Sequence, residues 1–394
     1  MIGAATPRVE DARFLRGEGR YVADLKLPGM LEACVLRSPY GHARLIGIDA
    51  SEALALPGVH AVITAADLPE GIPPIPCRVP THGDMSGFLQ PVIGREVARY
   101  YGEPFAVVVA ESRGLAEDAA ELVEMDWDPL PALATAEQAE AEDAPRIHEA
   151  GNVASRWGVD LGDVEAAKRE AAAVVRETYR VQRHTAMPLE TRGLLAQFHP
   201  ARNLLEVFGP TKVPHTNRAI LAQMLQLAEG DIRFVEPDVG GSFGARGEFY
   251  PEDFLIPWIA RRLNRPIRWI EDRLEHFAAI NHSREMRFEL TACADAEGRL
   301  TALDVRLLAD MGAYIRTHGD IVPSHAVAQF PGPYSLRNYR CQAVAALSNK
   351  TPTGTLRAPG MFEANFARER AVDRLADKLG LDRLEFRRRN LVTA

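Results

Sequence analysis

The segment PDVGGSFGARGEFYPED, at positions 237–253, brings three glycines and an aromatic side chain together directly after a strand-like run. Gly240, Gly241 and Gly244 permit a close approach to the backbone, and Phe243 among them has to project away from it. On spacing alone, a tight turn between a strand and a helix accounts for the glycines. The aromatic side chain instead favours a loop that lies against a flat cofactor or substrate, so both interpretations stay open.

A phosphate-binding role does not fit the spacing of this loop. The dinucleotide fingerprint requires G-x-G-x-x-G, and a P-loop requires a lysine and Ser or Thr after its last glycine, where Ala245 and Arg246 stand. The helix expected to follow has Pro251 in its first turn, beside Glu252 and Asp253, whose charges oppose a phosphate at that end. An unrelated nucleotide-binding protein is therefore the least favoured class.

A second loop of the same kind, KTPTGTLRAPGMFEANF, occupies positions 350–366. It also contains Gly and Pro turns, carries Arg357, and leads into a helix-like stretch. Two such loops in one region of the chain predict two walls of one pocket.

The elements that must hold these loops follow from the apolar periodicity. A strand at 232–236 enters the first loop, and a helix at 216–228 precedes that strand. Two strand-like runs within 286–308 flank ADAEGR and predict a hairpin. A helix over 362–379 follows the second loop, with Gly380 as its stop.

The chain is expected to be α+β and to divide into two regions. Residues 13–127 contain short strand-like runs and one helical stretch, which is typical of a small mixed domain. Residues 128–150 are rich in proline and acidic residues and predict an exposed linker. Residues 151–394 form a second, larger α+β region that carries both loops.

Composition narrows the class of protein. The 394 residues carry a net charge of −8, which argues against a nucleic-acid partner because phosphate attraction needs a basic face. The four cysteines are scattered without a C-x-x-C pair, so we expect no iron–sulfur cluster and no side-chain metal ligands within the chain. No apolar stretch of about 18 residues predicts a membrane span, and no signal-peptide core is present. A cytoplasmic protein is the default expectation.

Six segments together resemble the molybdopterin-binding subunit of the xanthine dehydrogenase and aldehyde oxidase family, the molybdenum hydroxylases. Their order and spacing match over nearly the whole chain. The first resembles the opening of an a/b hammerhead domain, which we place at 13–127. The others resemble the first molybdopterin-binding domain, which we place at 151–394. The segments are RFLRGEGRYVADLKLPGMLEACVLRSPYGHARL (13–45), MPLETRG (187–193), GPTKVPH (209–215), VGGSFGARGEF (239–249), DMGAY (310–314) and TLRAPGMFEANFARERAVDRLADKLG (355–380).

The resemblance implies an oxidoreductase that acts on an aldehyde or an N-heterocycle with oxygen derived from water. The cofactor would be molybdenum held by the dithiolene of molybdopterin, in its plain or cytosine dinucleotide form, and not by protein side chains. Electrons would leave through 2Fe–2S clusters to FAD, both carried by partner subunits. The Phe243 loop would lie against the molybdenum site, and the Arg357 loop would form the opposite wall around a small-molecule substrate.

The length of the chain departs from the family. The family's subunit is about twice as long, and its second molybdopterin-binding domain supplies the glutamate that acts as a base. No catalytic residue can therefore be assigned here. Either a partner chain carries the second half, or the sequence is a fragment. The alternative function is a non-catalytic scaffold, a half-subunit that stabilises partners without turnover.

The resemblance assigns a set of site residues. Lys212 stands where many members have a glutamine next to the metal, so it either places a cation near an anionic centre or substrate, or extends to solvent. Phe243, His325 and Pro359 are the expected substrate pocket. The residues expected to bind the cofactor are Lys212, Gly241, Ser242, Phe243, Gly244, Arg357 and Ala358.

Several positions limit the substrate. Ala358 replaces the cysteine that holds copper in the family's carbon monoxide dehydrogenases, so that activity is not expected. Gly247 replaces a substrate-binding glutamate of purine-type members, and Glu248 is one residue away. His325 is either a pocket residue or a core histidine, and Arg246 faces either a phosphate or solvent.

Overall fold

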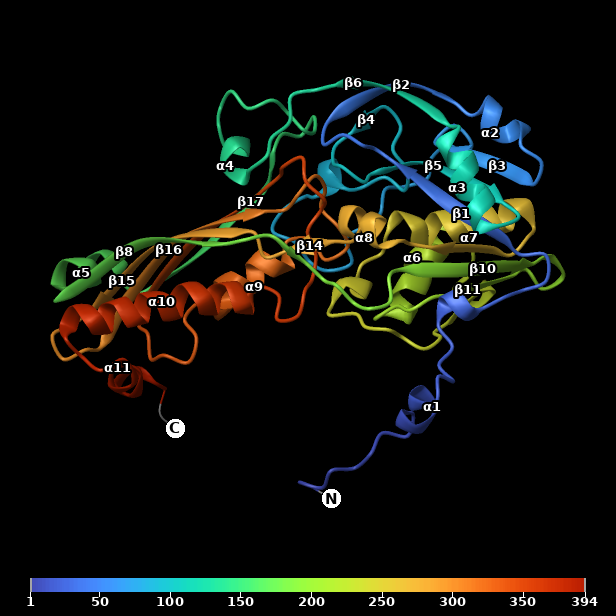
Figure 1. Cartoon of the computed structure of the whole chain (residues 1–394). Helices are drawn as coiled ribbons and strands as arrows, with labels where there is room; N and C mark the ends of the chain where they lie inside the picture. Colours follow the sequence, from blue (N-terminus) through green and yellow to red (C-terminus); the bar gives the residue numbers. More distant parts are fainter. Residues whose placement is uncertain (1, 393–394) are drawn as a thin grey trace.

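Two large β-sheets organise the chain, and each forms the core of one lobe in the computed structural model, which describes residues 2–392 (Figure 1). A seven-stranded sheet lies in the right lobe of the view and a five-stranded sheet in the left lobe. Helices pack against both sheets, so the predicted α+β class is confirmed.

The seven-stranded sheet has helices on both faces. Its strand order is β12-β11-β10-β13-β1-β5-β3. The strands are β1 (Leu31–Arg37), β3 (Val59–Thr64), β5 (Pro104–Ala110), β10 (Gly193–His199), β11 (Leu204–Phe208), β12 (Ile232–Val235) and β13 (Ile267–Ile270). Helices α6 (Pro214–Leu225) and α7 (Pro251–Leu263) share a core with Val107 and Val109 of β5, whereas α2 (Ser51–Ala55) and α3 (Arg113–Glu121) cover Ala106 and Val108 on the other face. Alternate residues of an apolar strand thus enter two cores.

The five-stranded sheet has one apolar and one charged face. Its order is β7-β17-β16-β15-β8. The strands are β7 (Val153–Leu161), β8 (Ala173–Val181), β15 (Met286–Ala294), β16 (Leu300–Asp310) and β17 (Asn338–Ala346), so the predicted hairpin is confirmed as β15 and β16. Helices α9 (Ile321–Gln329) and α10 (Met361–Leu379) bury the apolar face, and α11 (Arg383–Asn390) follows α10.

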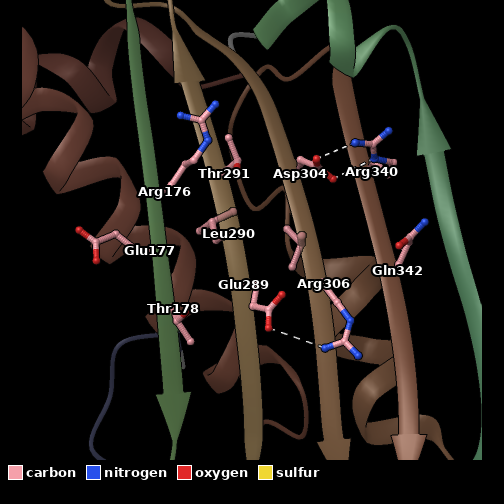
Figure 2. A pocket seen from close by; sticks show the side chains of 11 residues that line it. Arg176, Glu177, Thr178, Glu289, Leu290, Thr291, Asp304, Arg306, Arg340 and Gln342 are labelled. Carbon is pink, nitrogen blue, oxygen red and sulfur yellow. Dashed lines mark hydrogen bonds and ion pairs between the residues drawn. The ribbon is translucent and has the colours of Figure 1, made fainter. Parts of the chain in front are cut away.

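The opposite face of this sheet carries charged side chains that pair with one another. Figure 2 shows Asp304 beside Arg340 and Glu289 beside Arg306, at 2.7 and 3.8 Å, around an open hollow of about 690 Å³. Helices α4 (Ala136–Ala139) and α5 (Val164–Glu170) border this face. Because its charges are mutually satisfied and open to water, we interpret it as a solvated surface.

The segment 128–150, predicted as an exposed linker, is exposed at most positions but is held to the core at a few. Leu133 and Ile147 are buried in the core of the five-stranded sheet, at 5% and 3% exposure. The Leu133 backbone N–H also donates to Oδ1 of Asn349 at 2.8 Å. Proline and acidic residues mark the outer side of this segment, while a few apolar side chains fasten it to the core.

The expected hammerhead region, 13–127, shares a sheet with a later part of the chain. Strand β1 pairs in parallel with β13, which places Leu31 opposite Ile267 in one continuous sheet. Sequence position therefore does not separate the lobes, because 190–280 folds with the N-terminal region.

Several residues that are typical of helix ends stand where the helices begin or end. Pro251 opens α7 as predicted, and Gly380 ends α10 with φ of 69°. Asp382 caps α11 by accepting from the backbone N–H of Leu384 and Glu385. The helical stretch expected within 13–127 is α3, which ends at Glu121 because β6 begins at Glu124.

The remaining elements are short. A three-stranded sheet has the order β4-β2-β6, and β9 pairs with β14. These strands are β2 (Ala43–Asp49), β4 (Val97–Ala98), β6 (Glu124–Pro129), β9 (His184–Thr185) and β14 (His282–Ser283). The short helices are α1 (Asp11–Leu15), η1 (Val22–Asp24), η2 (Ser86–Phe88), η3 (Pro200–Arg202), η4 (Glu229–Asp231), η5 (Ala245–Gly247) and α8 (Arg273–Ala279). Helix α1 buries no residue and lies in an arm that runs away from the body (Figure 1). Within residues 2–392, no helix has the length and hydropathy of a membrane span.

Candidate functional site

The two glycine- and proline-containing loops lie directly against each other, as their shared character predicted. The backbone N–H of Arg357 donates to the carbonyl of Phe243 at 2.8 Å, and Oγ1 of Thr355 donates to the carbonyl of Gly244 at 3.1 Å. A Cβ at Gly244 would lie 2.9 Å from the carbonyl oxygen of Thr355, so glycine is required there. The first loop follows β12 and leads into α7, and the second leads into α10.

The glycine loop has a left-handed backbone at three of its four central positions. Gly241, Phe243 and Gly244 have φ of 111°, 51° and 105°. Glycine adopts this conformation freely, but a phenylalanine there is strained by about 1–2 kcal/mol. Its side chain is half exposed, at 50%, so no core packing offsets that strain. Strain of this kind is concentrated at functional sites.

The same loop presents unused hydrogen-bond donors. Within the part of the chain that the structure describes, the backbone N–H groups of 241–244 have no acceptor. The Ser242 Oγ is buried and also lacks a partner. Buried polar groups are normally satisfied, so this row of donors fits a ligand rich in acceptor oxygens or nitrogens.

Arg246 holds this loop from behind. Its Nε donates to the carbonyl of Gly241 at 2.7 Å, and its Nη2 donates to Oε2 of Glu190 at 3.0 Å. The same Glu190 oxygen accepts the backbone N–H of Gly240 at 2.8 Å. Arg246 is buried, and desolvation lowers its pKa. Arg246 therefore faces neither phosphate nor solvent, and Glu190 holds the loop together with it.

The second loop is held by residues that sequence reasoning missed. Arg284 is buried and donates to the carbonyl of Ala358 and to Oε2 of Glu363, each at 3.1 Å. Its guanidinium also lies over the ring of Phe362, 4.7 Å from the ring centroid. Ala358 has φ of 57°, a second strained non-glycine position. No motif surrounds Arg284 in the sequence, so only the fold could have found it.

His325 lies behind the second loop on α9. A Cβ at Gly360 would lie 2.8 Å from Cβ of His325, so the helix packs closely against the residue that follows Pro359. His325 is half-buried, and Pro359 is equally partly covered, while Arg357 and Ala358 are exposed. All four expected residues of this wall are thus brought together at one place.

Lys212 joins the far end of the glycine loop. Its backbone N–H donates to the carbonyl of Arg246 at 3.0 Å. Its side chain is exposed, but Cδ lies only 3.2 Å from the position of a Cβ at Gly247. The stem therefore lies over the loop while the side chain remains open to water, and a position near an anionic centre or substrate stays a prediction.

Glu248 is turned inward and is not available to a substrate. It is buried and accepts hydrogen bonds from Oγ1 of Thr317, from Nδ1 of His318 and from the backbone N–H of Thr355. Burial opposes ionisation, but His318 and these hydrogen bonds win and lower the pKa of Glu248 to about 2. Its carboxylate therefore ties the two loops together from inside.

The surface around the loops is unusually apolar. Large apolar side chains lie exposed on three of the segments that meet here, the glycine loop, the second loop with the start of α10, and the MPLETRG stretch. They are Met187, Leu189, Val239, Phe243, Met361, Phe362 and Phe366. Exposed apolar patches of this kind mark a surface that something else covers.

Sequence comparisons decide the family. The family model of the molybdopterin cofactor-binding domain matches residues 147–391. The model of the a/b hammerhead domain of aldehyde oxidase and xanthine dehydrogenase matches residues 16–131. The chain belongs to the aldehyde oxidase and xanthine dehydrogenase family. The expected homology is therefore confirmed, and the segment that joins the two matches is the packed one described above.

Relatives within the aldehyde oxidase and xanthine dehydrogenase family differ in length. The chain is 39% identical to the 6-hydroxypseudooxynicotine dehydrogenase complex subunit gamma of Paenarthrobacter nicotinovorans, over 100% of this chain and 50% of that protein. Quinoline 2-oxidoreductase from Pseudomonas putida 86 superposes with a TM-score of 0.95 and 38% identity, over 99% of this chain and 50% of that one. The nicotinate dehydrogenase large molybdopterin subunit of Eubacterium barkeri is 28% identical, over 98% of this chain and 88% of that protein. The chain thus spans about half the length of the first two and most of the third.

Proposed function

We propose that this chain is one half of the molybdopterin-binding part of a molybdenum hydroxylase. The complex would oxidise an aldehyde or an N-heterocycle with oxygen derived from water. The observation that carries the proposal is the pair of touching loops, one of which presents the free N–H groups of 241–244 and the orphaned Ser242 Oγ.

These residues fit the molybdenum-pterin cofactor by their chemistry. Within residues 2–392 no cluster of His, Cys, Asp or Glu is arranged to hold a metal, so a metal carried by an organic ligand suits the site. The backbone N–H groups of Gly241, Ser242 and Gly244 would donate to acceptor atoms of the cofactor. When bound, the cofactor supplies the redox chemistry, and the protein supplies position and charge.

The remaining site residues would shape the space for substrate. The Arg357 N–H holds the backbone of Phe243 in its strained conformation, and the half-exposed ring would exclude water and contact a flat molecule. His325 and Pro359 would form the opposite side. Lys212 would bring a positive charge to the end of the same loop.

A second chain would complete the site. The exposed apolar side chains around the loops form the surface that this partner would cover. The catalytic base would come from the partner, because Glu190 and Glu248, the carboxylates that contact the glycine loop in residues 2–392, are engaged in holding loops. A relative called a large molybdopterin subunit is covered to 88% by this chain, so the family includes a subunit of about this extent, and a division between two chains is part of the proposal.

The finer composition of the complex is part of the same proposal. We expect subunits that carry FAD and 2Fe–2S clusters as electron acceptors, and the cytosine dinucleotide form of molybdopterin remains one option for the cofactor. The rival function is a scaffold half-subunit without turnover, which the exposed surface alone would equally support.

One experiment separates the two functions. The chain is co-expressed with the products of the neighbouring open reading frames and purified through a tag on this chain. We expect molybdenum and pterin in the complex, and reduction of an artificial electron acceptor with an N-heterocycle or aldehyde. A folded complex that contains neither molybdenum nor pterin would establish the scaffold instead.

A further inference from the structure

A group of cationic side chains meets beside Gly247, at the end of the glycine loop. Lys212 Cδ, His318 Cε1 and Arg78 Nη2 lie 3.2, 3.3 and 3.7 Å from the position that a Cβ would take at Gly247. The three residues come from distant segments: before α6, before α9, and between β3 and β4. The absence of a side chain at Gly247 is what lets them come so close together.

Hydrogen bonds join Arg78, His318 and Glu248 in a row. Arg78 Nη2 lies 2.5 Å from Nε2 of His318, and Nδ1 of His318 lies 2.5 Å from Oε1 of Glu248. A guanidinium can only donate, so Nε2 must accept and Nδ1–H must donate to the carboxylate. The permanent charges are then Arg78 and Lys212 against the single charge of Glu248.

The carboxylate of Glu248 is already engaged in hydrogen bonds. Besides His318, it accepts from Oγ1 of Thr317 and from the backbone N–H of Thr355. A second carboxylate, Glu236, is engaged by the backbone N–H of Thr211, the neighbour of Lys212. Neither forms an ion pair with Lys212 within the described part of the chain.

The two permanent cations each keep an unused donor. Arg78 Nη1 is buried and has no hydrogen-bond partner. Lys212 makes no side-chain hydrogen bond or ion pair with any residue in 2–392, whereas Lys168 and Lys350 both pair with carboxylates. A buried donor without a partner is costly, and an oxyanion between the two side chains would satisfy both at once.

We propose that Arg78 and Lys212 form an oxyanion subsite beside Gly247, which holds a carboxylate of the substrate. This assignment of the substrate class, an aldehyde or N-heterocycle that bears a carboxylate, rests on the proposed function. The anion-binding property itself rests only on the side chains described. Gly247 is three residues after Gly244, so the subsite adjoins the wall that carries Phe243.

The direct test measures binding to the full chain by titration calorimetry in low salt, where screening is weak. The probes are pyridine-3-carboxylate and pyridine-3-carboxamide, which match in shape and differ in charge. We expect the carboxylate to bind at least about tenfold more tightly, and Lys212→Met and Arg78→Met each to remove about tenfold. Lys26→Met, at another exposed lysine, is the matched control and should change nothing.

A third probe identifies the source of the anion. Inorganic phosphate stands for the phosphate of the cofactor. If phosphate binds more tightly than the carboxylate, with the same sensitivity to Lys212→Met, the substrate assignment is wrong and the subsite belongs to the cofactor. Equal affinity for carboxylate and carboxamide, or a carboxylate affinity that Lys212→Met leaves unchanged, overturns the subsite itself. Because Lys212 is exposed, Lys212→Met should fold even if Arg78→Met does not.

A second variant tests the geometry. Gly247→Glu fills the space where Arg78 and Lys212 meet, and should abolish binding of the free carboxylate. A variant that still binds pyridine-3-carboxylate like the parent chain would contradict the location. If these tests fail, the complex should still contain molybdenum, and the proposed function stands. If the complex contains no molybdenum, the proposed function is refuted, but the chain should still bind the anion.

Discussion

Replacement of Phe243 by alanine tests whether the glycine loop serves a ligand or the core. Full burial of a phenylalanine side chain contributes roughly 1.5–3 kcal/mol. Phe243 is 50% exposed, so about half of that, near 1 kcal/mol, is at stake, and water fills the space without leaving a cavity. Alanine keeps the same left-handed backbone at a similar cost, so strain does not change the comparison. We expect a small loss of unfolding free energy and a large loss of turnover in the assembled complex.

Phe254 supplies the matched control. It follows the same loop on α7 and is fully buried, so Phe254→Ala should cost roughly 3–5 kcal/mol through lost burial and a cavity. Urea denaturation of both variants measures the difference, and turnover of the complex with a saturating substrate measures the functional loss. A Phe243→Ala chain that is as destabilised as Phe254→Ala, or a complex with unchanged turnover, would refute the assignment of this side chain to the site.

Three further outcomes follow from the contacts around the loops. Arg246→Met should lose about 3–5 kcal/mol of unfolding free energy in denaturant, because it removes the ion pair with Glu190 and the donor of three backbone carbonyls. The exposed Arg357→Met should unfold like the parent, and equal stability of both variants would contradict the role of Arg246 in holding the loop. The folded pKa of Glu248, about 2, lies below its ordinary value of 4.5, so the stability it contributes is present above pH 4.5 and lost as pH falls towards 2. The stability difference between the parent and Glu248→Gln should therefore shrink over that range, and a constant difference would show that the carboxylate is not held as an anion. Trypsin should first remove the arm at Arg8–Arg16, since α1 buries nothing, and early cleavage within 128–150 would contradict the packing of that segment.

The sequence was most informative about structural elements that depend on one continuous stretch of the chain. Apolar periodicity located the β15–β16 hairpin and α10, because burial on one face leaves a repeat in the sequence. The two loops were found from glycine, proline and aromatic spacing, because these residues restrict or free the backbone locally. Their contact was inferred from nothing more than shared character and resemblance.

The sequence was least informative where distant segments meet. The pairing of β1 with β13 unites residues 31–33 with 267–269, and no local pattern encodes it. The composition of 128–150 predicted an exposed linker, because composition averages over the whole segment and does not reveal the few buried side chains that fix it. Arg284 and Arg78 lie outside every recognised motif, and their roles arise from contacts with residues more than 70 positions away.

The molybdenum and pterin content of the complex tests the central claim most directly. The chain, purified with the co-expressed partner that supplies the second half, is analysed by elemental mass spectrometry and by fluorescence of the oxidised pterin. The donors of 241–244 and Ser242 predict about one molybdenum and one pterin per copy of the chain, in line with how such sites bind a single cofactor. A stable, folded complex with this partner that contains neither would contradict the account.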